Sequence, residues 1–467
     1  MRYAPLCLLL LAMACAGTSV PPTETVTPPS PPPITNPPSP PPVTPPPAPA
    51  PSTDDGVGPL AMRSSDFIDT IGVNAHFERL QDGKTIWSKQ QVGLRQKLLE
   101  SGIGHIRTAQ AGNLATGSAY LRYLQSLDGV KINLQTDWNQ RLTNLPQIGT
   151  DLGRQLATIE PRNEPDINNW SDTESPQQLR DLQKTLFELR AANASLSNVK
   201  MLGPSILFEK SARLVGDISA HVDYLNPHMY TGTSAPEGIY SDAGSDGNGY
   251  GSVKSAKAMH SIMGGDQCLM VTEAGEHNDH QQVSGHLGTT EKIAGRYIPR
   301  VYLELARRGV CRTFIYELVD EWNDPTNVEA NFGLLRNDLT EKPAFTAVKN
   351  MITLLADTSN THSSFAAGQL NYTLSGSTKN VSQMLFQKAD GTFYLALWLG
   401  KRAWDWKTRS EVAVADQLVT VNVATRKTSA IHRLDDAGII TRGATQAIIG
   451  GQLEVSLSDR VTFVALK

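Results

Sequence analysis

Between residues 67 and 355, short apolar runs alternate with stretches in which apolar residues recur at helical spacing. The apolar runs predict strands at 67–75, 103–108, 130–137, 156–162, 200–204, 222–230, 268–273 and 312–319. The helical patterns between and after them cover 89–101, 118–127, 176–194, 207–221, 253–263, 289–308 and 344–355. Strands alternating with helices over about 290 residues predict an α/β fold of the (β/α)8 TIM-barrel type.

A doubly wound open sheet would alternate in the same way, so periodicity alone leaves both architectures open. No Gly-rich phosphate-binding fingerprint follows the first predicted strand, which disfavours a nucleotide-binding sheet. We therefore expect the barrel, over residues 59–357.

Beyond residue 358 the helical period disappears. Short apolar runs with turn residues between them predict strands at 369–375, 381–387, 392–399, 417–423, 430–434 and 453–466. Residues 358–467 are therefore predicted to form a β-sandwich. A strand from the segment just before Phe67 could complete it.

The N-terminus has the features of an export signal. Arg2 precedes the apolar run 6–13, which is too short to span a bilayer and is typical of a signal peptide. The run ends in LAMAC, which resembles a bacterial lipobox, although Ala12 stands where such motifs usually have Leu. We expect residues 1–14 to be removed and Cys15 to carry lipid, with ordinary signal cleavage as the alternative.

Residues 15–58 are dominated by Pro and small polar residues, which favour an extended polyproline tether. A lipid anchor followed by such a tether places the protein at the bacterial cell envelope or surface, and without the lipid in the periplasm or medium. The net charge of −4 offers no argument for nucleic acid as a partner. We expect a monomer.

Two cysteines, Cys268 and Cys311, fall in the predicted folded body. They stand at the starts of the seventh and eighth predicted strands, which would be neighbours in a barrel. In an oxidising compartment such a pair is a candidate disulfide, with two buried free thiols as the alternative.

Chemically active side chains follow the predicted strands. Active sites of parallel barrels lie at the C-terminal ends of the strands, so these residues are site candidates. They are His76, Arg107, Asp137, Trp138, Asn163, Glu164, His228, Tyr230, Glu273, Asp320, Glu321 and Trp322. No Cys or His cluster has the spacing of a zinc site, so neither a metal nor a cofactor is expected.

Carboxylates, an amide and aromatic rings together suit cleavage of a glycosidic bond, in which one carboxylic acid protonates the leaving oxygen and a second carboxylate attacks the sugar. Trp138 and Trp322 would offer apolar faces to sugar rings. His76 is expected to contact substrate or to support the barrel rim. Glu160 lies inside an apolar strand and is predicted to be structural, and Glu276 is a rival to Glu273.

Three segments resemble the fourth-, sixth- and seventh-strand signatures of clan A glycoside hydrolases, most closely those of families 39 and 30. They are Asn163-Glu164-Pro165, Asn226-Pro227-His228-Met229-Tyr230 and Thr272-Glu273-Ala274-Gly275. The resemblance implies a retaining enzyme on a (β/α)8 barrel, with Glu164 as general acid/base and Glu273 as nucleophile. It also implies that Arg107, Asn163, His228 and Tyr230 support them.

The sequence departs from the clan pattern in two places. Arg162 precedes Asn163, where the clan often has an aromatic or small residue. At the end of the eighth strand, where the clan often has a Trp, this chain has the run Tyr316-Glu317-Leu318-Val319-Asp320-Glu321-Trp322.

The pattern and the resemblance together predict an exported retaining β-glycoside hydrolase acting on a polysaccharide or oligosaccharide. The alternative is a surface lipoprotein that binds glycan without cleaving it. If configuration is retained, the two glutamates should lie about 5 to 5.5 Å apart, whereas a separation near 9 Å would indicate inversion.

Overall fold

The computed structural model describes residues 58–111, 118–136, 139–167, 175–239, 253–264, 267–282, 287–357 and 365–467. The predicted signal and tether, including Cys15, lie outside these residues, as do Asp137 and Trp138. Within the described ranges, no helix combines the length and apolarity needed to cross a membrane.

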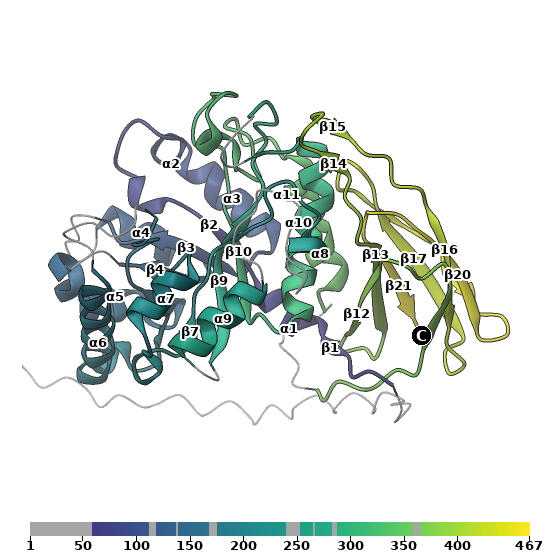
Figure 1. Cartoon of the computed structure of the whole chain (residues 1–467), viewed down its shortest axis with the longest axis horizontal. Helices are drawn as coiled ribbons and strands as arrows, with labels where there is room; N and C mark the ends of the chain where they lie inside the picture. The colour runs from purple at the N-terminus through teal and green to yellow at the C-terminus, as the bar shows by residue number, and fades with distance from the viewer. Residues whose placement is uncertain are drawn as a thin grey trace, which may run out of the picture. The chain divides into compact units, whose positions relative to one another are not determined.

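The N-terminal part is the predicted TIM barrel (Figure 1). Its parallel strands are β2 (Ile71–Asn74), β3 (His105–Ala109), β4 (Lys131–Gln135), β5 (Leu156–Glu160), β6 (Lys200–Met201), β7 (Tyr224–Leu225), β9 (Cys268–Gly275) and β10 (Arg312–Ile315). The last strand, β10, pairs with the first, β2, and a bridge from Leu202 to Tyr224 links β6 to β7. The short β8 (Met229–Tyr230) follows β7 and also pairs with β9. The ring is therefore nearly closed.

Helices cover the outside of these strands (Figure 1). They are α2 (Ile86–Lys89), α3 (Gln91–Ser101), α4 (Ala119–Gln125), α5 (Leu145–Leu152), α6 (Pro176–Ala192), α7 (Glu209–Val215), α8 (Pro236–Ile239), α9 (Val253–Met263), α10 (Glu291–Arg307) and α11 (Pro343–Leu355). Apolar residues of strands and helices, such as Ile106, Leu134 and Val348, share one buried core. Burial of this shared apolar surface holds the helices on the strands.

Two predicted strands differ from the observed elements. Residues 64–69 form helix α1 (Ser64–Asp69), so the strand expected from residue 67 begins only at Ile71. The buried residues of α1, Ser64 and Phe67, stand three residues apart, which is a helical spacing. The strand expected at 222–230 is broken into β7 and β8 around Pro227, which has no N–H for a strand ladder.

The C-terminal part consists mainly of antiparallel sheets, as predicted. One sheet contains β1 (Met62–Arg63), β12 (Val381–Gln387), β13 (Phe393–Leu399), β21 (Thr462–Leu466), β17 (Thr428–Leu434), β18 (Ile440–Arg442) and β19 (Gln446–Ala447). A second contains β11 (Thr373–Gly376), β16 (Gln417–Asn422) and β20 (Gln452–Leu457), and a small hairpin pairs β14 (Trp404–Asp405) with β15 (Ser410–Glu411). Apolar residues of both larger sheets, including Leu395 and Val421, form a common core.

Strand β1 precedes the whole barrel in the sequence, yet it pairs in parallel with β12 of the sandwich. This is the additional strand predicted from the segment before Phe67. Helix α10 also contacts the sandwich, because buried Arg300 donates to Glu237 at 2.8 Å and to the carbonyl oxygen of Asp459 at 3.2 Å.

A disulfide joins Cys268 to Cys311, the pair singled out from the sequence. Cys268 is the first residue of β9 and Cys311 immediately precedes β10. The bond therefore links the N-terminal ends of neighbouring strands.

Candidate active site

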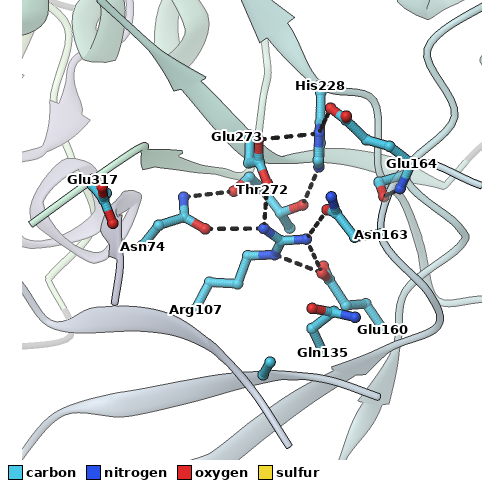
Figure 2. A network of polar contacts seen from close by, with 12 residues as sticks. Asn74, Arg107, Gln135, Glu160, Asn163, Glu164, His228, Thr272, Glu273 and Glu317 are labelled. Carbon is cyan, nitrogen blue, oxygen red and sulfur yellow. Dashed lines mark hydrogen bonds and ion pairs between the residues drawn. The ribbon is translucent and has the colours of Figure 1, made fainter. Parts of the chain in front are cut away.

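Arg107, on β3, is the centre of a buried polar network at the C-terminal ends of the barrel strands (Figure 2). Its Nη1 donates to Glu273 Oε1 at 2.6 Å and to Asn74 Oδ1 at 3.0 Å. Its Nη2 donates to Asn163 Oδ1 at 2.6 Å, and its Nε to Glu160 Oε1 at 2.5 Å. One guanidinium thus fixes side chains that come from the ends of three other strands, β2, β5 and β9.

Glu160 is a fully buried carboxylate at the end of β5. Besides the bond from Arg107, it accepts hydrogen bonds from Asn133 at 3.1 Å and Asn226 at 3.0 Å, both on Oε2. The side chain is buried, and Arg107, Asn133 and Asn226 occupy its oxygens. Glu160 therefore has the structural role predicted for it, with Arg107 as its ionic partner.

Glu273, near the end of β9, is held as an ionised carboxylate. Oε2 accepts a hydrogen bond from the hydroxyl of Tyr230 at 2.6 Å, while Arg107 occupies Oε1. Burial alone would raise the pKa of Glu273, but the charges of His228 and Arg107 and the bond from Tyr230 outweigh it, and the pKa is lowered. A carboxylate that stays ionised in a buried site is suited to act as a nucleophile.

His228 lies between the two glutamates. Its Nδ1 is 2.6 Å from Glu164 Oε1 and 3.4 Å from Glu273 Oε2. Its Nε2 is 3.1 Å from Thr272 Oγ1, and that hydroxyl donates in turn to Asn226 Oδ1 at 2.6 Å. Burial would lower the pKa of His228, but the charge of Glu273 and the contact with Glu164 raise it overall. A raised pKa favours the protonated ring, whose Nδ1–H can donate to Glu164 Oε1.

Glu164 lies just beyond β5, in a loop that turns its side chain toward His228 (Figure 2). Its φ is +38°, in the left-handed region that non-glycine residues seldom adopt. The backbone N–H donates to Ser205 Oγ at 2.9 Å, which anchors this conformation. Such strain is found where the surrounding structure fixes a side chain for function.

The carboxylates of Glu164 and Glu273 face one another at close range. Their nearest oxygens and the ring nitrogen of His228 all lie within 4.8 Å of one another. An inverting enzyme keeps its two carboxylates about 6.5–9.5 Å apart to admit a water molecule, whereas a retaining enzyme keeps them near 5–5.5 Å. An oxygen–oxygen distance of no more than 4.8 Å lies on the retaining side of this comparison.

Six of the predicted site residues come together in this network. They are Arg107, Asn163, Glu164, His228, Tyr230 and Glu273. His76 lies to one side, bonded to Glu78 at 2.9 Å, and Trp322 is 41% exposed in the loop after β10. The roles predicted for His76 and Trp322 stay predictions, and Trp138 falls outside the described residues.

Glu276, the rival to Glu273, is buried and makes no contact with Arg107 or Tyr230 among the described hydrogen bonds. Burial raises the pKa of Glu276 well above its usual value, which favours a neutral acid. A neutral carboxyl group is a poor nucleophile, so the structure favours Glu273.

Sequence reasoning did not assign Asn74 or Thr272 to the site. Asn74 accepts from Arg107 and donates to the carbonyl oxygen of Thr272 at 2.9 Å, which links the first strand to the seventh. Both residues end or approach the end of a predicted strand, and that position was the available signal. Tyr316 was likewise noted only as a departure from the clan pattern. Its backbone oxygen packs so closely on Gly275 that a Cβ added to Gly275 would lie only 2.5 Å from it, so a larger residue would clash there.

Comparison with solved structures identifies the fold. A family 39 glycoside hydrolase from the gut symbiont Bacteroides cellulosilyticus WH2 matches with a TM-score of 0.55 and 17% identity over 88% of this chain and 83% of its own. The GH39 enzyme from Xanthomonas axonopodis pv. citri matches with a TM-score of 0.55 and 14% identity, covering 89% of this chain and 96% of its own. A GH30 endoxylanase from Clostridium papyrosolvens C71 gives a TM-score of 0.51 at 13% identity, over 89% of this chain and 98% of its own.

These structures share the fold of the present chain and belong to the families that its motifs resemble. At the level of sequence, no family profile and no curated protein matches the chain. The fold is therefore shared with glycoside hydrolases, and the activity is argued from the geometry of the site.

Proposed function

We propose that this protein is an exported retaining β-glycoside hydrolase that cleaves a polysaccharide or oligosaccharide by double displacement. The observation that supports this most strongly is the approach of Glu164 and Glu273 to within 4.8 Å, in two different environments. Glu273 is bound by Arg107 and Tyr230 as an anion, while Glu164 contacts Nδ1 of His228.

In the first step, an oxygen of Glu273 attacks the anomeric carbon of the bound sugar as the bond to the leaving oxygen breaks. Glu164 gives its proton to that oxygen, and the sugar remains linked to Glu273 as an ester. In the second step, Glu164 takes a proton from water, the water oxygen attacks the same carbon, and the ester bond to Glu273 breaks. Two inversions leave the configuration unchanged.

Asn163 is placed to recognise the sugar during these steps. Because its Oδ1 accepts from Arg107, the amide is oriented with Nδ2 directed away from that guanidinium. This N–H group can donate to a sugar hydroxyl beside the anomeric centre, a contact that strengthens in the transition state.

Substitution of the two glutamates tests the assignment. Glu273→Gln should lower kcat at least about 10³-fold on every substrate, because an amide cannot form the ester intermediate. Glu164→Gln should lower hydrolysis of alkyl glycosides by about 10²–10⁴-fold. It should slow formation of the glycosyl-enzyme much less with a dinitrophenyl glycoside, whose leaving group needs no proton.

Glu276→Gln is the matched control, because burial raises the pKa of Glu276 and favours the neutral acid, and glutamine has nearly the same shape. It should retain activity. A first-formed product of inverted configuration, seen by NMR, would contradict double displacement. Binding of a glycan panel with no product released would instead support a glycan-binding lipoprotein.

Export and anchoring form a separate part of the proposal, supported by the signal-like N-terminus, Cys15 and the Pro-rich segment that follows. The full chain expressed in a bacterium should fractionate with membranes, and Cys15→Ser should release it. If both forms fractionate alike, lipid on Cys15 is not the anchor.

A further inference from the structure

A second cluster of ionisable side chains lies where the first and last barrel strands end. His76 follows β2, and its two ring nitrogens face two different carboxylates. Nδ1 is 2.9 Å from Glu78 Oε1, and Nε2 is 3.3 Å from Glu317 Oε2. Figure 2 draws Glu317 at the edge of the catalytic network, with no dashed contact to it. The cluster is thus distinct from the Arg107 network.

Glu317 is 0% exposed, and neither of its carboxylate oxygens has a hydrogen-bond donor among the described residues. Nε2 of His76 likewise makes no hydrogen bond in the described part of the chain, although Glu317 is close. A buried carboxylate without a donor is unfavourable unless something neutralises it. Protonation can neutralise Glu317 alone, whereas a bound cation would neutralise it and also engage the unpartnered Nε2 of His76.

Glu78 determines which ring nitrogen of His76 is free to bind that group. Its Oε1 accepts from Nδ1–H, while its Oε2 lies 3.2 Å from Thr108 Oγ1 and 3.3 Å from the backbone nitrogen of Ala109. With the proton on Nδ1, Nε2 carries a free lone pair, 3.3 Å from Glu317 Oε2. A carboxylate that fixes the far nitrogen of an imidazole is a common outer partner of metal-binding histidines.

Glu321 supplies a third group to the same place. Ligand atoms of His76, Glu317 and Glu321 all lie within 4.8 Å of one another. Arg79 and Trp87 donate to Glu321 from one side, and a carboxylate has about four acceptor positions, so one remains available. Among the described residues, Arg79 forms ion pairs with Glu78 and Glu321 and none with Glu317, so the three carboxylates of the cluster leave negative charge for a divalent cation.

We propose that His76, Glu317 and Glu321 bind a divalent cation, Zn²⁺ by preference. One imidazole nitrogen and two carboxylate oxygens form a donor set that zinc accepts, at bond lengths of about 2.0–2.2 Å. Two ligands of a tetrahedral ion at about 2.0–2.1 Å lie about 3.3–3.4 Å apart. The separation of His76 Nε2 and Glu317 Oε2 is 3.3 Å, without a hydrogen bond.

The ion would join the C-terminal ends of β2 and β10, the strands whose pairing closes the barrel on one side. Asn74, the last residue of β2, bonds to Arg107, so the ion would also hold the edge of the proposed active site. Sequence spacing predicted no metal, because these ligands come from opposite ends of the barrel sequence. The inference does not depend on the proposed hydrolase activity.

The test uses the full chain after removal of metal with EDTA. Wild type equilibrated with ZnCl₂ and separated from free ions should retain about one equivalent by elemental analysis, and its Tm should rise. Glu317→Gln should weaken zinc binding at least tenfold and remove the Tm increase. Glu78→Gln should weaken it about 10–100-fold, as expected of an outer partner.

A second group, formed by Glu164, His228 and Glu273, also brings three possible ligands together. Glu164→Gln is therefore the matched control, and it should keep the zinc equivalent. In metal-free buffer, Glu317→Gln should melt no lower than wild type, because it removes a buried charge without a donor. Absence of zinc uptake by wild type, or its loss in Glu164→Gln but not in Glu317→Gln, would overturn the proposal.

Calorimetric titration with MnCl₂ and CaCl₂ should show weaker binding than titration with ZnCl₂. Tighter binding of Mn²⁺ or Ca²⁺ would refute the preference for zinc.

Discussion

Arg107 Nη1 lies 2.6 Å from Oε1 of Glu273, and the same guanidinium lies 2.5 Å from the structural carboxylate of Glu160. The proposed nucleophile is therefore positioned by a cation that is itself fixed by the barrel core. Arg107 therefore positions Glu273 and, with His228 and Tyr230, keeps it ionised.

Replacement of Arg107 by methionine should raise the pKa of Glu273 and shift the acidic limb of kcat/KM upward by about 1–3 pH units. It also leaves Glu160 and Glu273 without their buried cation, which should cost about 3–5 kcal/mol of unfolding free energy. Arg107→Lys keeps the charge and should shift the limb less. An unchanged pH profile in a folded methionine variant would contradict this role of Arg107.

Tyr230→Phe removes the hydroxyl that donates to Glu273 Oε2 at 2.6 Å. A hydrogen bond to a charged group contributes about 1.5–3 kcal/mol, so kcat/KM should fall about 10–100-fold while the fold is kept. Tyr123→Phe is the control, because its hydroxyl bonds to the backbone of Gln91, outside the catalytic network. Equal losses in the two variants would show that Tyr230 acts only through packing.

The pKa directions predict a bell-shaped dependence of kcat/KM on pH. The pKa of Glu273 is lowered, because His228 and Arg107 outweigh burial, so the acidic limb should lie below 4.5. The pKa of His228 is raised, because Glu273 and Glu164 outweigh burial, so the alkaline limb should lie above 6.5. An acidic limb above 4.5 in wild type would contradict the ion pairs described.

The same shifts predict how stability depends on pH. Glu273 contributes stability that is present above 4.5 and is lost as the pH falls through its lowered pKa. His228 contributes stability that is fully present below 6.5 and is lost as the pH rises through its raised pKa. Urea unfolding of wild type and His228→Gln across this range should show the alkaline loss only in wild type.

The disulfide between Cys268 and Cys311 should affect stability and leave catalysis unchanged. It closes a separation of 43 residues, for which chain entropy predicts about 4 kcal/mol as an upper estimate. Replacing both cysteines by serine should lower the free energy of unfolding by about 2–4 kcal/mol in urea titrations. Activity at 25 °C should persist, since the bond links the strand ends opposite the site. A matching loss of kcat would show that the two barrel faces are coupled.

Local pattern was sufficient for the barrel and for most of the site. Glu164, His228 and Glu273 each follow a strand-like run, and parallel strands bring their ends together. The element that contains Phe67 was wrongly predicted, because the buried face of α1 pairs Phe67 with the polar Ser64, which an apolar pattern does not reveal.

Contacts between distant segments could not be read from the sequence. Asn74 acquires its role only when β2 and β9 bring it beside Arg107 and the carbonyl of Thr272. The convergence of His76 with Glu317 likewise depends on β2 pairing with β10. Both follow from barrel closure, which local spacing does not encode.

The parallel pairing of β1 with β12 has a consequence for synthesis. Met62 leaves the ribosome before the barrel, but its partner Phe386 is made only after the barrel is complete. The barrel is thus an insertion between the first strand of the sandwich and the rest of it. A fragment ending at residue 357 would contain every barrel strand and leave β1 as an unpaired edge, a known hazard for aggregation.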